Sequence, residues 1–305
     1  MDSLTGQLLG ITTVLCWTLS VQLFEFASKR IGAVFVNIIR ISVALSFFTV
    51  LLYCRKGLLL PTDFPAHSWF LLSLSGVVGF FIGDIFLFKA LVALGPRLTM
   101  LLQTLSAPMA ALIGWVFLDE KYRMLQWLGM LVVLIGVAAV VLEKHGDRQG
   151  AQRLANRCGN RYGVLCALLA VVGQATGLIL SKAGMQVDGG YLDPFGATHI
   201  RAFAAFVCFI VFFIVTGKFT QFVEVVHDTK AIVVTAIGAV LGPFIGVSLS
   251  LWALHYLTAG VAATMFSLTP ICIIPFAVFL HKEHVSVRAM IGALVAVLGV
   301  YLLTL

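Results

Sequence analysis

Long apolar runs follow one another along almost the whole chain, and each is close to the length that crosses a membrane. A transmembrane helix needs about 20 mostly apolar residues, because the hydrocarbon core is about 30 Å thick. Only 11% of the 305 residues are charged, against about 25% in an average soluble protein. Lipid must therefore be the solvent for most of the chain. The sequence predicts spanning helices near 4–27, 33–53, 68–92, 98–118, 124–142, 162–182, 195–216, 230–256, 260–280 and 286–305.

The pattern within these runs indicates an all-α integral membrane protein. The runs are continuous rather than alternating, which is typical of helices and not of barrel strands. The net charge is +7, but the basic residues are not interleaved with aromatic ones, so we expect them to face membrane lipids and not nucleic acid. The first run is long enough to span, which favours a retained helix over a signal peptide. The cysteines show no CxxC spacing, and we expect no metal and no other cofactor.

A polar stretch at 143–161 divides the chain almost in half, and the two halves resemble each other. The segment GMLVVLIGVAAVVL at 129–142 aligns with GALVAVLGVYLLTL at 292–305. Such internal similarity indicates a duplicated structural unit. We therefore expect a first five-helix repeat at 1–142, a polar linker that forms a mobile surface loop, and a second five-helix repeat at 162–305.

Because each repeat has an odd number of helices, the second repeat must enter the membrane from the opposite face. The expected fold is thus ten transmembrane helices arranged as two inverted five-helix repeats. Inverted repeats are typical of alternating-access carriers, whose site lies near the bilayer midplane between the repeats. The further matches between the halves are Glu120 with Glu283, Gly83 with Gly246, Pro108 with Pro270, Lys29 with Lys182, and Arg40 with Arg201.

Each half also carries the same order of motifs, namely a proline, an apolar stretch, an FL-containing acidic segment and two glycines. These are Pro108, FLDEK (117–121), Gly129 and Gly136 in the first half, and Pro270, FLHKE (279–283), Gly292 and Gly299 in the second. The pattern resembles the EamA family of the drug/metabolite transporter superfamily, and IGDIFLFKAL and LGPRLTMLL resemble one bacterial subgroup of it.

This resemblance implies a central cavity between the halves and export of a small metabolite, such as an amino acid or a related compound. It implies a multi-pass protein of the bacterial cytoplasmic (inner) membrane, and a small-molecule substrate as its partner. It also implies cytoplasmic termini. The basic residues outside the helices, however, gather on the face opposite the termini, and the positive-inside rule then predicts the reverse orientation.

Two charges stand in the apolar stretch FFIGDIFLFKAL at 80–91. Asp84 lies deep in its run, where an ionised carboxylate costs at least about 2.5–3.5 kcal/mol on insertion scales. We therefore expect Asp84 to face the interior, paired or protonated, and to act in coupling or cargo contact; a structural hydrogen bond is the alternative. Lys89 is only six residues from Gly95, so its side chain can reach the interface.

Other charged residues are candidates for ion pairs or conformational roles. Arg40 and Arg201 recur in both halves, which favours a scaffold role over cargo chemistry. Glu25 and Lys29 are four residues apart on one helical face and predict a pair at the helix end, with a coupling role for Glu25 as the alternative.

Prolines and glycines in the runs predict bends and close helix contacts. Pro108 and Pro270 each remove a backbone hydrogen bond and free a carbonyl one turn back, which is tolerated where it faces a cavity or protein. Small residues four apart allow helices to approach closely. The pairs are Gly79 with Gly83 and Gly242 with Gly246.

Several polar and aromatic side chains lie within the runs as candidates for the cavity wall. Each alone is more simply read as a packing group or an interhelical hydrogen bond. Together they fit an uncharged lining for a zwitterionic or aromatic metabolite. They are Trp17, Gln103, Gln174, Ser248, Trp252 and His255.

The function most consistent with the sequence is that of a secondary transporter. Protons are candidates for the coupling ion. We expect the protein to be a monomer or a homodimer. A membrane channel or scaffold is the first alternative. An intramembrane hydrolase is the second, but an aspartyl dyad needs a second mid-helix Asp, and no GxSxG elbow is found. No P-loop or HExxH pattern occurs, so neither ATP-driven transport nor zinc hydrolysis is supported, and we expect no enzymatic activity.

Overall fold

The fold is described by a computed structural model over residues 2–94, 96–141, 161–217, 221–222, 225, 227–272 and 287–304. This part of the chain is helical except for loops and one short hairpin. The linker expected at 143–161 lies outside the described residues except for Arg161, where a helix begins.

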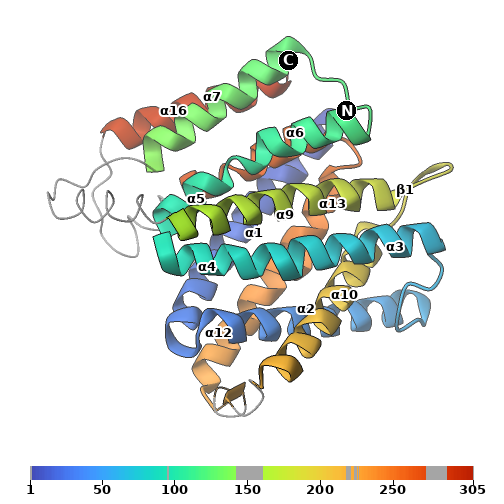
Figure 1. Cartoon of the computed structure of the whole chain (residues 1–305). Coiled ribbons are helices and arrows are strands. Elements are labelled where there is room, and N and C mark those ends of the chain that lie inside the picture. The colour runs from blue at the N-terminus through green and yellow to red at the C-terminus, as the bar shows by residue number, and fades with distance from the viewer. Residues whose placement is uncertain are drawn as a thin grey trace, which may run out of the picture.

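Every apolar run found in the sequence contains a helix or a row of consecutive helices (Figure 1). In the first half these are α1 (Asp2–Ile31), α2 (Ala33–Lys56), the row α3 (Ala66–Ser75), η1 (Gly76–Gly83) and α4 (Asp84–Leu94), the row α5 (Pro96–Gln103) and α6 (Ser106–Phe117), and α7 (Met124–Val141).

The second half repeats this order after the hairpin that follows its first helix. The elements are α9 (Arg161–Met185), β1 (Gln186–Val187), β2 (Gly190–Tyr191), α10 (Pro194–Thr216), the row α12 (Thr229–Ala239), η2 (Val240–Gly246) and α13 (Val247–Ala253), then α14 (Ala259–Phe266) and α16 (Val287–Thr304). The strands β1 and β2 pair antiparallel, with Gln186 opposite Tyr191.

Length and composition identify a multi-pass membrane protein. Within the described residues, 6 helical runs are long and apolar enough to cross a membrane. Shorter apolar helices occupy the remaining predicted runs, so a total of ten crossings stays a prediction. The long runs are Leu4–Ile31, Ala33–Lys56, Ala66–Ala90, Arg161–Met185, Pro194–Thr216 and Thr229–Ala253, and the short ones are Leu101–Phe117, Met124–Ala139, Ala259–Cys272 and Met290–Leu303.

The two halves pack through matching helix pairs. Helix α1 lies against the row α12–η2–α13, and its counterpart α9 lies against the row α3–η1–α4. Helices that correspond in the two halves also meet directly: α2 packs on α10, α6 on α14, and α7 on α16. In Figure 1, α7 and α16 run side by side along one edge of the bundle. The halves therefore interlock and share one interior.

Glycines set the close approach of α7 and α16. A Cβ atom on Gly136 would lie 2.5 Å from the backbone nitrogen of Ala296, and one on Gly299 would lie 2.6 Å from the nitrogen of Val133. Only glycine allows backbones to come so near. The two repeated glycine pairs of the sequence thus make this interhelical contact.

Each row of three helices contains a π-helical segment at the same place in its half. Residues 76–83 form η1 and residues 240–246 form η2, which includes Pro243. A π-helix is wider than an α-helix and is uncommon, and it often marks a functional site. Asp84 immediately follows the first of these segments.

Candidate functional site

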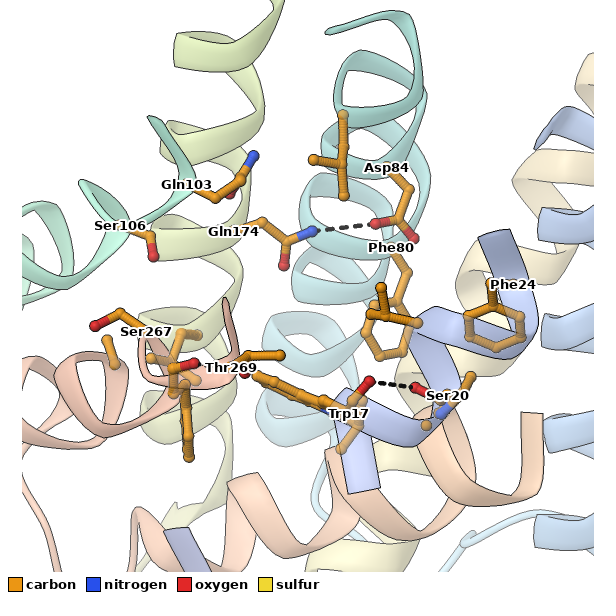
Figure 2. A pocket seen from close by; sticks show the side chains of 18 of the residues that line it. Trp17, Ser20, Phe24, Phe80, Asp84, Gln103, Ser106, Gln174, Ser267 and Thr269 are labelled. Atoms are coloured by element: carbon orange, nitrogen blue, oxygen red, sulfur yellow. Dashed lines mark hydrogen bonds between the residues drawn. The ribbon is translucent and has the colours of Figure 1, made fainter. Parts of the chain in front are cut away.

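A cavity of about 290 Å³ lies between the two halves. Elements α1, α2, η1, α4, α5 and α6 line it from the first half, and α9, η2, α13 and α14 line it from the second. Its wall is largely apolar and includes the aromatic rings of Trp17, Phe24, Phe80 and Phe266. Figure 2 shows Gln103, Gln174 and Asp84 on one side of the cavity and Trp17 with Ser20 on the other. The polar lining residues are Ser20, Arg40, Asp84, Gln103, Thr104, Ser106, Gln174, Ser267 and Thr269.

Asp84 is held in the cavity wall by partners from two other helices. Its side chain is buried, with 4% of the residue exposed. Arg40 of α2 donates from Nη2 to Asp84 Oδ2 and forms an ion pair with it. Gln174 of α9 donates from Nε2 to Asp84 Oδ1 at 3.1 Å (Figure 2). Of the two states expected for this carboxylate, the structure shows the paired one, in which an opposite charge offsets the cost of burial.

Arg201 lies behind the wall of the cavity. This residue of α10 is 4% exposed, and its guanidinium carbon lies 4.3 Å from the centroid of the Phe80 ring. Its repeat counterpart Arg40 also lies over an aromatic ring, 5.5 Å from the centroid of Phe24. Among the described residues the buried Nε of each arginine has no hydrogen-bond partner, but Arg40 forms an ion pair with Asp84 through its Nη2.

The predicted lining residues divide into two groups. Trp17, Gln103 and Gln174 line the cavity together with Asp84. Ser248, Trp252 and His255 lie outside it. The Ser248 hydroxyl donates to the Phe244 carbonyl at 2.6 Å, Trp252 is 38% exposed, and the His255 ring stacks on Tyr191 of the hairpin. Spacing along one helix could not tell which face looks inward.

Of the remaining charged candidates, Lys89 is not among the residues that line the cavity. Lys89 is exposed, with its Nζ 5.5 Å from the centroid of the Phe86 ring. This exposure agrees with a side chain that reaches toward the interface. Glu25 belongs to α1, but its side chain is outside the described part of the structure.

Both predicted proline breaks border the cavity. The break before Pro108 separates α5 from α6, and the Thr104 carbonyl that the proline leaves free accepts from the amide of Ala107 at 3.2 Å. Before Pro270, the Phe266 carbonyl accepts from the Thr269 hydroxyl at 2.8 Å. Neighbouring groups thus replace the hydrogen bonds that the prolines remove.

The predicted glycine pairs make close helix contacts beside the cavity. A Cβ atom on Gly177 of α9 would lie 3.1 Å from Cα of Gly79, and one on Gly173 would lie 3.0 Å from Cα of Gly83. In the second half, a Cβ atom on Gly242 would lie 2.8 Å from Ser20 Oγ, and one on Gly246 would lie 2.7 Å from Trp17 Cδ1.

A second polar cluster, which we call the latch, was missed in the sequence. It consists of Glu120, Tyr122 and Lys182. Lys182 Nζ donates at 2.7 Å both to Glu120 Oε1 and to the carbonyl of Leu257. Both carboxylate oxygens of Glu120 accept from the amide of Ala259 at 3.0 Å. The latch therefore joins the α6–α7 connection, the end of α9 and the start of α14.

Tyr122 and the backbone complete the latch. The Tyr122 hydroxyl donates to Glu120 Oε2 and accepts from the amide of Gly260 at 3.1 Å. Burial, and then the hydrogen bond to Glu120, raise the pKa of Tyr122 above its ordinary value. Asp119 reaches the required turn with a φ of 51°, in the left-handed region. The signal that could have revealed the latch is the recurrence of Glu120 and Lys182 as Glu283 and Lys29.

The repeat counterparts of the latch differ in their surroundings. Lys182 is buried, with 6% of the residue exposed, whereas Lys29 is exposed. Glu283 is outside the described residues. Two lysines at the same position of a repeated sequence thus occupy opposite environments.

Paired apolar helical halves that enclose a cavity are the architecture of a multi-pass membrane protein. A family model, the EamA-like transporter family, matches residues 4–142 and again residues 161–305. The chain belongs to the EamA-like transporter family, as the resemblance of its motifs predicted, and it consists of two EamA repeats.

Comparison with known structures supports the same fold. A crystal structure described only as "Crystal structure of protein" matches with a TM-score of 0.70 at 16% sequence identity. The match covers 97% of this chain and 95% of that chain. At this identity the likeness shows the fold alone. No curated protein matches the sequence.

Proposed function

We propose that the protein is a secondary transporter that carries a small metabolite, such as an amino acid or a related compound, by alternating access. The two EamA repeats would be inverted, and the cavity between them would open to each side of the membrane in turn. The observation that carries this proposal is the opposite environment of Lys182 and Lys29. When two inverted repeats adopt different conformations, each repeat can take up the conformation of the other. This exchange moves the opening of the cavity from one side of the membrane to the other.

The latch would close one end of the transporter in the present conformation. It joins the α6–α7 connection to α9 and α14, at the end of the bundle that also carries both chain termini (Figure 1). Residues of the first repeat that line the cavity, such as Arg40 in α2 and Leu87 in α4, lie toward the ends of their helices that are farther from the latch. In the opposite conformation, Lys29 would become buried and Lys182 would become exposed.

Asp84 would be the coupling or cargo-contact residue of this site. Asp84 is the acidic residue among the described lining side chains. The symmetry of the repeats does not explain its presence, because Val247 occupies the equivalent position in the second repeat. Its pairing with Arg40 can be broken by a proton or by a charged group of the cargo. Gln174 would hold the carboxylate in position through its 3.1 Å hydrogen bond.

Transport by the purified protein in proteoliposomes tests the proposal. We expect uptake of at least one labelled compound from a panel of amino acids and nucleosides, without ATP, and with a rate that changes when a pH gradient is imposed. Empty liposomes provide the control. If no panel member crossed faster than in empty liposomes, the proposal would lose its support. Flux that never saturated with concentration would favour the channel alternative.

A further inference from the structure

A basic surface with an aromatic ring at its centre joins α1 to α12. Phe26 of α1 is exposed, and two cations lie over its ring. The guanidinium carbon of Arg30 is 5.9 Å from the ring centroid, and Nζ of Lys230 is 5.4 Å from it. Both basic side chains are exposed, and Lys230 belongs to the second repeat. We call Phe26, Arg30 and Lys230 the basic rim.

The basic rim lies where two helices of opposite direction end and begin. Helices α1 and α12 pack against each other (Figure 1). Arg30, in the last turn of α1, binds Asp228, which precedes α12, whereas Ser20 lies against Gly242, beyond the end of α12. The helices are therefore antiparallel. The end of a spanning helix reaches the level of the lipid head groups, so the basic rim lies at that level.

The described charges of the basic rim are not balanced. Arg30 donates from Nε to Asp228 Oδ2 at 2.8 Å, and a guanidinium group carries further donors on its Nη atoms. Within the described part of the chain, Lys230 forms no ion pair. Two cations thus share one carboxylate, and a further anion of single charge would balance them.

An apolar track leads from the basic rim toward the middle of the membrane. Leu19 lies seven residues before Phe26 on the same face of α1, and it is exposed. Val233 and Ile237 lie three and seven residues after Lys230 on the same face of α12, and both are exposed. Two adjoining helices therefore present apolar side chains below the two cations.

We propose that the basic rim binds one anionic phospholipid, with its phosphate against Arg30 and Lys230 and an acyl chain along the apolar track. Basic residues at a membrane surface attract anionic lipids, and a phosphodiester carries the single negative charge that the rim lacks. The bound lipid joins the two EamA repeats, because Arg30 belongs to the first and Lys230 to the second.

The surface fits other phosphate compounds less well. A soluble phosphate would pair with the cations but leave the apolar track without a partner. A zwitterionic phospholipid would cover the track but bring a cation of its own beside Arg30 and Lys230, where like charges repel. Tight binding therefore requires both a net negative head group and an acyl chain.

Three probes separate these two requirements. They are dioleoylphosphatidylglycerol, dioleoylphosphatidylcholine with the same chains, and sn-glycerol 3-phosphate without chains. Each is added to the purified full-length protein in a nonionic detergent, and native mass spectrometry and thermal unfolding follow binding. We expect the phosphatidylglycerol to bind several-fold tighter than the phosphatidylcholine and to raise the melting temperature, and sn-glycerol 3-phosphate to do neither. Equal effects of the two lipids, an equal effect of sn-glycerol 3-phosphate, or no binding of the phosphatidylglycerol would each overturn the inference.

A matched pair of variants tests whether the basic rim holds the lipid. Lys230→Gln removes one cation of the rim, and we expect phosphatidylglycerol to bind about fivefold more weakly, the loss expected for one basic residue near an anionic head group. Lys89→Gln removes the same charge from another exposed lysine, whose Nζ lies 5.5 Å from the ring centroid of Phe86. We expect this control to bind within about twofold of wild type.

The variants separate the basic rim from the general charge of the protein. If both weakened phosphatidylglycerol binding equally, or if neither did, the rim would not be the lipid site. Circular dichroism confirms that both variants are folded. Since the measurement involves no transport, its outcome is independent of the proposed function.

Discussion

Lys182 Nζ lies 2.7 Å from Glu120 Oε1, whereas Lys29, which the repeat places at the equivalent position, is exposed. A duplicated sequence has therefore folded into two halves with different local structure at this position. The buried lysine ties the end of α9 to the α6–α7 connection, and the Leu257 carbonyl ties it to the loop before α14. Such asymmetry between equivalent residues is what a carrier captured in one of two conformations should show.

We predict that Lys182→Met and Lys29→Met have unequal effects on stability. Lys182→Met leaves the buried Glu120 carboxylate without its cation, and breaking a buried ion pair costs about 3–5 kcal/mol. Lys29→Met removes an exposed charge, whose interactions are worth about 0–1 kcal/mol. Thermal unfolding in detergent should show a large decrease for the first variant and a small one for the second. Equal decreases would mean that the latch does not stabilise this conformation.

We predict that Asp84→Asn abolishes pH-dependent transport. Asparagine keeps the size of the side chain and can still accept from Gln174, but it cannot titrate or pair ionically with Arg40. Lys89→Gln provides the control, because Lys89 is exposed and lies outside the cavity. Initial rates in proteoliposomes at several pH values provide the measurement. If Asp84→Asn folded and retained both its rate and its pH profile, Asp84 would be structural only.

We predict that Gly76→Ala disrupts the contact between η1 and α10, whereas Gly79→Ala is tolerated. A Cβ atom on Gly76 would lie 2.2 Å from the carbonyl oxygen of Arg201, so a backbone must move. On Gly79 the nearest atom would be Arg201 Nη2 at 3.6 Å, an ordinary contact. Overpacking of this kind typically costs about 1–3 kcal/mol or more. The melting temperatures of the two purified variants test this prediction. A lower melting temperature for Gly79→Ala than for Gly76→Ala would refute the packing argument.

We predict that Asp228 contributes a pH-dependent stabilisation at the start of α12. The hydrogen bond from Arg30 Nε at 2.8 Å, and then the amide of Ala231, hold the pKa of Asp228 below its usual value. A lowered pKa in the folded state means that the charged form stabilises the fold above the ordinary pKa. This contribution is lost as the pH falls through the folded-state value.

The variant Asp228→Asn keeps the cap acceptor but removes the charge. Thermal unfolding should therefore show a higher melting temperature for wild type than for the variant at neutral pH, and the difference should shrink as the pH falls through the lowered folded-state pKa of Asp228. A difference in melting temperature that stayed constant from neutral to strongly acidic pH would exclude a contribution from the charge.

Much of the fold could be predicted from the sequence, because lipid imposes strong and simple constraints on a chain. The apolar runs located the helices, the glycine pairs at 79 and 83 and at 242 and 246 predicted close helix contacts, and the prolines predicted the bends beside the cavity. The need to offset a buried carboxylate also predicted that Asp84 would be paired or protonated. These inferences depend on local composition and on the free energy of burial.

The details of the site depended on long-range packing that the sequence alone did not reveal. The π-helical segments η1 and η2 change which face of each row looks inward, so the spacing of Ser248 and Trp252 gave no guide to their orientation. The partner of Asp84 comes from a helix more than forty residues away in the chain. In the sequence, each charged residue of the latch resembles an ordinary charged residue near a loop. Only the fold brings these residues together.

The central claim is that one cavity is reached from both sides of the membrane in turn, and accessibility of a single cysteine measures it directly. Ser106 lines the cavity, so Ser106→Cys is placed in a protein whose six native cysteines are replaced. A membrane-impermeant thiol reagent is then added to one face or the other of sealed vesicles. The account predicts labelling from either face, more slowly from the face that the latch closes, with no release of a trapped dye. Labelling from one face alone would contradict alternating access.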